Sequence, residues 1–326
     1  MDVYSIISLF GGLALFLYGM HTMSAGLEKL SGSKLQSTLQ KMTAHTSTSL
    51  IFGAAITIAI QSSSALTVML VGLVNSGIMQ LEQTVSVILG GNIGTTLTAW
   101  ILSLSGISGD SIFINLLKPE NFSPIVALIG VIMIMACNTQ KKKDIGGVFV
   151  GFAILMYGMT LMSGSVAPLA DMPEFTGILT AFNNPFLGVL VGLVFTGIIQ
   201  SSAASVGILQ ALSLTGCITY GMAIPLVMGL NIGTCATALL SSIGTTKNAR
   251  RVAIVHITGK IIGTVFCMIV FYGLNAIIGF GFINSPLSAP EVALCHTVFN
   301  IITTIILLPV RKVLIKISLS LIHISE

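Results

Sequence analysis

Long apolar runs recur along the chain, separated by short polar segments. A helix needs about 20 mostly apolar residues to cross the hydrocarbon core of a bilayer. Runs of about this length predict spanning helices at 3–27, 84–104, 145–167, 221–243, 261–283 and 292–310, with a shorter one at 123–138. The pattern therefore predicts an all-α polytopic membrane protein with about seven spanning helices.

Two further apolar stretches, at 48–79 and 187–218, carry polar residues in their centres. The first contains Gln61-Ser62-Ser63-Ser64 and the second contains Gln200-Ser201-Ser202. Each stretch could form one spanning helix or a re-entrant hairpin of two short helices. A break in a helix at membrane depth is tolerated only where it is buried in protein or lines a cavity. The choice between the two forms depends on where the flanking charges fall.

The chain contains an internal repeat, because a shift of 139 residues aligns its two halves without a gap. Tyr18-Gly19-Met20 then meets Tyr157-Gly158-Met159, Gln61-Ser62-Ser63 meets Gln200-Ser201-Ser202, Asn92-Ile93-Gly94-Thr95 meets Asn231-Ile232-Gly233-Thr234, and Gly53, Gly77 and Gly90 meet Gly192, Gly216 and Gly229. We expect one transmembrane domain over 1–326, with repeats at about 5–138 and 144–283, a final spanning helix at 290–310 and a basic cytoplasmic tail at 311–326.

The distribution of charge favours hairpins at both polar stretches. With hairpins, the basic residues of the loops share one face: Lys29, Lys34, Lys41, Lys141–Lys143, Lys247, Arg250, Arg251, Arg311, Lys312 and Lys316. The other face holds Asp2, Asp110, Lys118, Glu120, Asp171, Glu174 and Glu291. Full spans would instead export Lys141–Lys143, against the positive-inside rule. The charges thus predict inverted-topology repeats, as in many secondary transporters, with the N-terminus outside and the C-terminus in the cytoplasm.

A helix break of this kind offers ligands for both signs of charge. The first half-helix ends with free carbonyls, and the second begins with free N–H groups. Inverted symmetry would bring the two breaks together near the membrane midplane. The elements GNIGTTLTA (91–99) and LNIGTCATA (230–238) recur early in the helix after each hairpin. They either open the helix and supply ligands or pack closely through Gly94 and Gly233.

Composition narrows the function to transport. Hydrophobic residues make up 54% of the chain and charged residues 7%, with a mean hydropathy of +1.01, whereas soluble domains carry about 25% charged residues. No nucleophile, base and acid set indicates an enzyme, and the basic loops need no nucleic acid to explain them. We interpret His21, His256 and His296 as hydrogen-bonded packing residues and Lys260 as an interfacial lysine that snorkels.

The paired motifs resemble those of the type II sodium/phosphate cotransporters and their bacterial relatives. QSSS in the first repeat, QSSA in the second and a G-x-NIGT element after each carry the resemblance, which covers about residues 5–310. It implies sodium-coupled uptake of inorganic phosphate. Ala203 stands where the family usually has a third serine, which puts one contact in doubt. Many bacterial relatives add a PhoU-like domain, and we expect this chain to hold the membrane part without one.

The expected site follows from the motifs and the resemblance. Substrate-binding candidates are Gln61, Ser62, Ser63, Ser64, Gln200, Ser201, Ser202, Asn92 and Asn231. Sodium candidates are Gln61, Ser63, Thr95, Thr96, Gln200, Ser202, Ser205 and Thr234. Sodium is favoured over the proton because the predicted spans contain no Asp or Glu, and neutral oxygens suit an alkali cation.

We therefore expect a symporter that imports phosphate by alternating access, with sodium as coupling ion and no other cofactor. The alternatives are a sodium-coupled symporter of another small anion and a phosphate sensor or channel without net transport. The expected location is the cell (inner) membrane. The expected partners are phosphate, sodium and lipid, with no nucleic acid, and the sequence leaves a homo-oligomer open.

Overall fold

The chain is helical throughout the residues that the computed structural model describes, which are 3–31, 45–104, 119–166, 168 and 184–324. Within them, six segments are long and apolar enough to cross a membrane. The run at 123–138 falls in a shorter apolar helix, Asn121–Ala136. The prediction of an all-α polytopic protein is confirmed.

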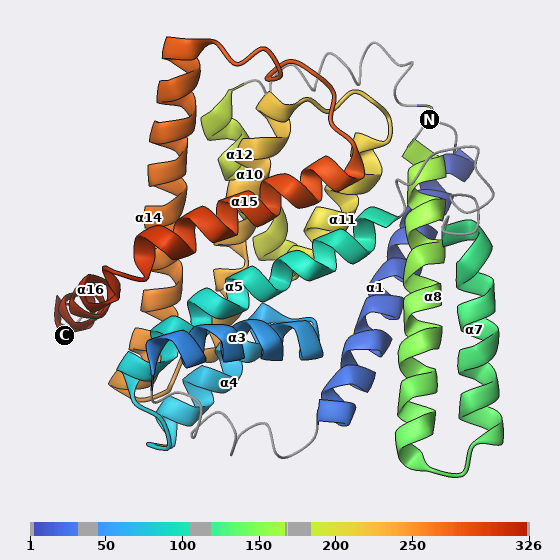
Figure 1. Cartoon of the computed structure of the whole chain (residues 1–326), viewed down its shortest axis with the longest axis horizontal. Coiled ribbons are helices and arrows are strands. Elements are labelled where there is room, and N and C mark those ends of the chain that lie inside the picture. Colours follow the sequence, from blue (N-terminus) through green and yellow to red (C-terminus); the bar gives the residue numbers. More distant parts are fainter. Residues whose placement is uncertain (1–2, 32–44, 105–118, 167, 169–183, 325–326) are drawn as a thin grey trace.

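Three helices lie side by side at one edge of the molecule (Figure 1). They are α1 (Val3–Ser31), α7 (Pro119–Ala136) and α8 (Gln140–Val166). The remaining helices form a larger group beside them. They are α3 (Thr46–Ile60), α4 (Ser63–Asn75), α5 (Leu81–Ser103), α10 (Pro185–Ile199), α11 (Ser202–Ser213), α12 (Tyr220–Gly233), α13 (Cys235–Ser241), α14 (Lys247–Ile278), α15 (Ala289–Leu307) and α16 (Arg311–Ile324).

The internal repeat is visible in the packing as well as in the sequence. Helix α3 crosses α5 so closely that a Cβ on Gly90 would lie 1.9 Å from the Leu50 carbonyl oxygen. Helix α10 crosses α12 in the same way, since a Cβ on Gly229 would lie 2.1 Å from the Val189 carbonyl oxygen. Both residues of the second contact follow those of the first by 139 positions. Glycine is required at both crossings because any side chain would collide with backbone.

Helices α1 and α8 make a contact that the repeat maps onto itself. Gly12 packs against Gly158, and Gly19 packs against Gly151, so the two helices run antiparallel. The shift of 139 residues carries Gly12 to Gly151 and Gly19 to Gly158, which exchanges the two contacts. Such an exchange is the signature of a two-fold axis between two copies of one unit.

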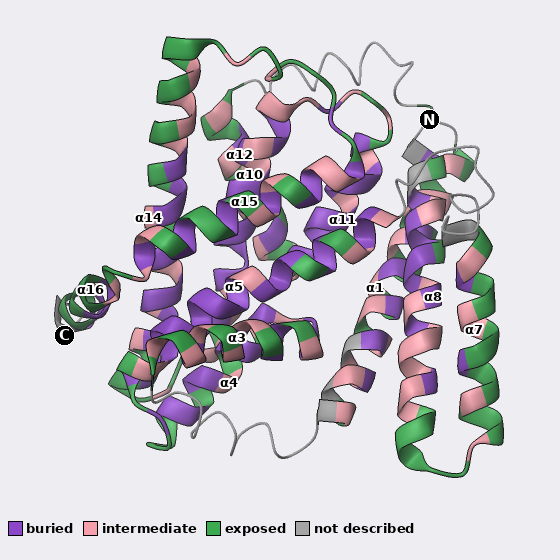
Figure 2. Ribbon diagram, viewed as in Figure 1, coloured by how far each residue is buried: buried purple, intermediate pink, exposed green. Residues whose placement is uncertain are grey.

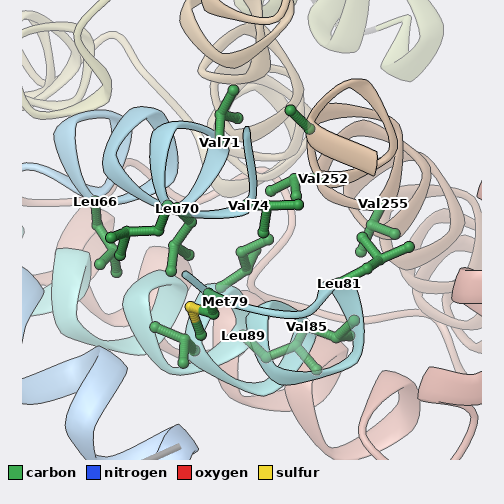
Figure 3. Close-up of a cluster of buried hydrophobic side chains, with 14 of the residues drawn as sticks. Leu66, Leu70, Val71, Val74, Met79, Leu81, Val85, Leu89, Val252 and Val255 are labelled. Atoms are coloured by element: carbon green, nitrogen blue, oxygen red, sulfur yellow. The ribbon is translucent and has the colours of Figure 1, made fainter. Parts of the chain in front are cut away.

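Buried apolar side chains join the first repeat to the C-terminal helices. Figure 3 shows side chains of α4, the turn before α5, and α5 packed against α14. The labelled members are Leu66, Leu70, Val71, Val74, Met79, Leu81, Val85, Leu89, Val252 and Val255. Burial is concentrated on α5, α11 and α12, while α7 and the upper part of α14 are largely exposed (Figure 2). Exposed isoleucines on α14, such as Ile261 and Ile269, suit contact with lipid.

The helix expected at 261–283 begins earlier than the hydrophobic pattern indicated. Helix α14 starts at Lys247 and continues to Ile278 without a break. Lys260 therefore lies inside this helix, about 20 Å along it from the first residue at 1.5 Å per residue. The segment at 311–326, expected as a tail, is helical over Arg311–Ile324, and its Leu314 packs near Gly259 of α14.

Candidate functional site

Both polar stretches are broken into two helices at the predicted glutamine. Gln61 ends α3 with φ 55° and ψ 26°, and Gln200 ends α10 with φ 58° and ψ 20°. Among the described residues, these are the non-glycine residues with positive φ. Ser62 and Ser201 then cap the next helices, accepting hydrogen bonds from the backbone N–H of Ala65 at 3.1 Å and of Ala204 at 3.2 Å.

The left-handed glutamines produce the breaks. A left-handed residue costs about 1–2 kcal/mol unless it is glycine, so its repetition at one offset indicates a required conformation. At each break the end of one helix and the start of the next leave carbonyls and N–H groups unbonded within their own helices. The two breaks are thus equivalent in backbone, as the repeat predicted.

The side chains of the two glutamines are placed differently. Gln61 is buried, its Nε2 donates to the Ile58 carbonyl at 2.6 Å, and its Oε1 accepts from Thr98 Oγ1 at 2.8 Å. Gln200 is exposed, and its backbone N–H bonds to the Thr196 carbonyl. The first break is therefore tied to α5, whereas the second leaves its glutamine side chain accessible.

The serines follow the same division between anchored and accessible groups. Ser63 and Ser202 are buried, and Ser62, Ser64 and Ser201 are half-buried. The Ser201 hydroxyl also lies 3.7 Å from the sulfur of Met20, within the Tyr-Gly-Met element of α1. Ser205 is buried and donates to the Ser201 carbonyl at 3.0 Å. Ala203, in place of a third serine, is buried as well.

The threonines of the two NIGT elements donate to their own helices. Thr95 bonds to the Gly91 carbonyl, Thr96 to the Ile93 carbonyl and Thr234 to the Leu230 carbonyl, at 2.7–2.9 Å. A hydroxyl that donates still has lone pairs for a cation.

The elements lie in the middle of their helices and not near the start as expected. Helix α5 continues unbroken through the first element, whereas α12 ends at Gly233, within the second, and α13 begins at Cys235. Only the second copy opens its helix.

Two threonines outside the predicted set occupy matching positions in the repeats. Thr57 and Thr196 differ by 139 positions, lie four residues before the two break glutamines, and are 1% and 0% exposed. Neither hydroxyl has a hydrogen-bond partner among the described residues. Each lies against a glycine of an NIGT element, because a Cβ on Gly94 or Gly233 would fall 2.8 Å from the threonine Cβ. A buried hydroxyl without a partner is costly, so these two are candidates for ligand contact.

Lys260 is placed differently from the prediction, and the interpretation as a snorkelling lysine is wrong. It is 5% exposed, and its Nζ donates to Asn231 Oδ1 at 2.7 Å and to Asn300 Oδ1 at 3.1 Å. Asn231 was predicted to bind substrate directly, but its carbonyl oxygen accepts from the lysine. Asn92, its counterpart in the first repeat, lines a small cavity together with Lys260 and His256.

The histidines near the spans were interpreted as hydrogen-bonded packing residues. His256 and His296 are buried as expected, but Nδ1 of each has no hydrogen-bond partner among the described residues. His21 is exposed on α1. No described hydrogen bond connects the break at Gln61 to the break at Gln200, so their meeting near the membrane midplane stays a prediction.

The fold and the repeated motifs define a class: a multi-pass α-helical membrane protein built from two copies of one unit, each with a broken helix pair. The Na+/Pi-cotransporter family matches residues 15–164 and again residues 154–289, once for each copy. The chain belongs to this family. The resemblance in the motifs is thereby confirmed.

Relatives of the chain are described in several organisms. YqeW of Bacillus subtilis, an uncharacterized protein, is 28% identical over 94% of this chain and 95% of its own length. YjbB of Escherichia coli, a putative inorganic phosphate export protein, is 25% identical over 94% of this chain and 53% of its own length. Human sodium-dependent phosphate transport protein 2B is 30% identical over 43% of this chain and 19% of its own length. The chain thus spans about half of YjbB and a fifth of 2B, and no solved structure matches it.

Proposed function

We propose that the protein is a sodium-coupled symporter that imports inorganic phosphate by alternating access, in the cell (inner) membrane. The observation that carries the proposal is the pair of helix breaks, each with a left-handed glutamine followed by a capping serine, in a chain of the Na+/Pi-cotransporter family. Helix ends that meet inside a membrane protein can bind a cation through carbonyls and an anion through N–H groups.

The proposed repeats have inverted topology. The antiparallel contact of α1 and α8, which the repeat maps onto itself, supports this, because a two-fold axis across two antiparallel spanning helices lies in the membrane plane. The arrangement in Figure 1 agrees with it: the turn between α7 and α8 lies at the same end of the molecule as the start of α14. Both segments are rich in lysine and arginine, which favours the cytoplasm for that end.

The two breaks supply different parts of the proposed site. Gln200, Ser201 and Ser64 have accessible side chains and suit phosphate, which needs donors. Sodium is bound by hydroxyl and carbonyl oxygens near the buried side of each break, including the unpartnered hydroxyls of Thr57 and Thr196. The charge of divalent phosphate requires at least two sodium ions merely to balance it, since each charge costs about 2.3 kcal/mol per 100 mV.

A relative with the opposite direction deserves its own test, because YjbB, which matches 94% of this chain, is named as a putative phosphate export protein. A symporter works in either direction and follows the gradients applied to it. We propose import under an inward sodium gradient. Uptake of labelled phosphate by proteoliposomes, with sodium outside, equal pH on both sides and sodium inside as a separate arm, measures both coupling and direction.

The same assay separates the remaining alternatives. Accumulation above the bath concentration excludes a channel or a sensor, and competition by sulfate or a small carboxylate tests for another anion. Accumulation on a proton gradient in sodium-free buffer would overturn sodium coupling. Phosphate efflux driven only by an outward sodium gradient, with no uptake in the reverse arrangement, would overturn import.

A further inference from the structure

The side chain of Lys260 is held inside the protein by two amide oxygens. Its Nζ lies 2.7 Å from Asn231 Oδ1 on α12 and 3.1 Å from Asn300 Oδ1 on α15. The three residues are 5%, 3% and 0% exposed. Each asparagine donates its Nδ2 to the carbonyl four residues earlier, Val227 or His296, at 2.9 and 2.8 Å. These bonds fix the amide groups so that both Oδ1 atoms face the lysine.

The ammonium group has no carboxylate beside it within the described structure. Helices α12, α13 and α14 contain no Asp or Glu, and Glu291 on α15 lies nine residues, or about 13 Å along the helix, from Asn300. The titratable groups that face Lys260 are His256 on α14, His296 on α15 and Cys235 on α13. None of these is an anion of the kind that usually accompanies a buried lysine.

Neutral amide oxygens around a positive charge are the environment that an alkali cation requires. The oxygens here belong partly to the repeated motifs. Asn231 is the first residue of the second NIGT element, and Asn92, the first residue of the other, lines the small cavity beside Lys260. The positive charge therefore lies between the two repeats. The repeat supplies it only once, because the offset of 139 residues matches Lys260 with Asn121.

We propose that the Lys260 ammonium is a tethered cation, which fills a site between α12, α14 and α15 where a sodium ion would otherwise bind. This inference rests on the proposed sodium-coupled transport and adds one element to it. A tethered cation compensates negative charge when phosphate binds, but it stays in the protein when the carrier returns. It therefore contributes nothing to the driving force, and the transporter binds one sodium ion fewer than its oxygen ligands could hold.

The test is to remove the ammonium and count bound sodium. Lys260→Ala and Lys260→Ser free Asn231 Oδ1 and Asn300 Oδ1 and leave space, whereas Lys260→Met fills the space without charge or oxygen. Binding of labelled sodium to the purified full chain, without phosphate, gives the number of ions per chain. We expect one more ion in the alanine and serine variants than in wild type and no increase in the methionine variant. Asn121→Ala, at the matching position of the first repeat, should leave the number unchanged.

Stability provides a second measurement in case the smaller side chains weaken the fold. The alanine and serine variants should melt lower than wild type in choline chloride and recover in sodium chloride, while Lys260→Met should show no such additional recovery. An unchanged sodium count in both variants, or equal losses in sodium and choline, would overturn the tethered cation. Wild-type protein that neither binds sodium nor transports phosphate with it would instead overturn the proposed function, so the two failures are distinguishable.

Discussion

Thr98 Oγ1 donates to Gln61 Oε1 at 2.8 Å and so ties the first helix break to the middle of α5. Both side chains are buried, at 2% and 9% exposed. The bond holds the glutamine with its oxygen toward α5 and its Nε2 on the end of α3. The first break thus has a fixed side-chain geometry, which a ligand would meet already formed.

Thr98→Val should weaken phosphate uptake without preventing membrane insertion. The substitution keeps the shape and leaves the Gln61 oxygen without its donor, at a cost of about 1–3 kcal/mol. A cost of this size corresponds to about a fivefold to 150-fold loss in uptake efficiency if the break must keep its geometry in transport. Thr215→Val, whose hydroxyl bonds only to the Leu212 carbonyl in a turn, is the matched control. Equal uptake by both variants would contradict a role for the Thr98 bond.

Thr57→Val and Thr196→Val should move stability and sodium affinity in opposite directions. Each removes a buried hydroxyl that has no partner in the described structure, so the melting temperature should rise by the equivalent of about 1 kcal/mol. If the hydroxyls bind sodium, the sodium concentration for half-maximal uptake should increase about tenfold, the equivalent of about 1.4 kcal/mol.

Thr84→Val serves as the control for these two variants, because the Thr84 hydroxyl is buried but bonded to the Leu81 carbonyl at 2.7 Å. It should lose stability and keep its sodium dependence. Unaltered sodium dependence in Thr57→Val and Thr196→Val, together with increased stability, would assign both threonines to packing alone.

The sequence predicted the helix breaks because polar residues in an apolar run, repeated at one offset, leave few alternatives. It did not predict the role of Thr98, although the residue lies within the quoted NIGT stretch. Helix α5 is buried on most of its surface, so hydrophobic periodicity does not show which face a residue occupies. Thr57 and Thr196 were missed because threonine in a spanning helix usually bonds to its own helix, and only coordinates show that these do not.

Lys260 was misplaced for a related reason. Charged residues at Lys247, Arg250 and Arg251 made the hydrophobic pattern begin after Lys260, which put the lysine at an expected helix end. The helix in fact starts at Lys247, since those charges belong to its first turns. Asn300 is 40 residues away and lies in α15, outside the repeat, so no spacing rule connects it to Lys260.

Gln200→Gly should separate the backbone role of the second break from its side-chain role. Glycine adopts φ 58° without strain, so the variant should unfold at a higher temperature, by the equivalent of about 1 kcal/mol. Phosphate uptake should nevertheless fall, because the exposed amide that we assign to phosphate is lost. Thermal unfolding in detergent and uptake in proteoliposomes measure the two effects. Full uptake in a stabilised Gln200→Gly protein would restrict this residue to shaping the backbone.

The inverted arrangement of the repeats can be tested by the side from which single cysteines are labelled. Lys142→Cys, in the first turn of α8, and Asn248→Cys, at the start of α14, both replace exposed residues. Position 249 is unsuitable because Ala249 is 0% exposed, and position 173 lies outside the described residues. Asn284→Cys, in the exposed turn between α14 and α15, replaces it for the opposite face.

In a background without the native cysteines, an impermeant thiol reagent added to whole cells should label Asn284→Cys only. Cysteines at positions 142 and 248 should react only after the membrane is opened. The reason is that re-entrant pairs at α3–α4 and α10–α11 return the chain to the side from which it entered, which keeps both basic turns in the cytoplasm. If each broken pair crossed the membrane instead, the turn before α8 would lie outside. Labelling of position 142 in intact cells would therefore contradict inverted repeats, whatever the substrate.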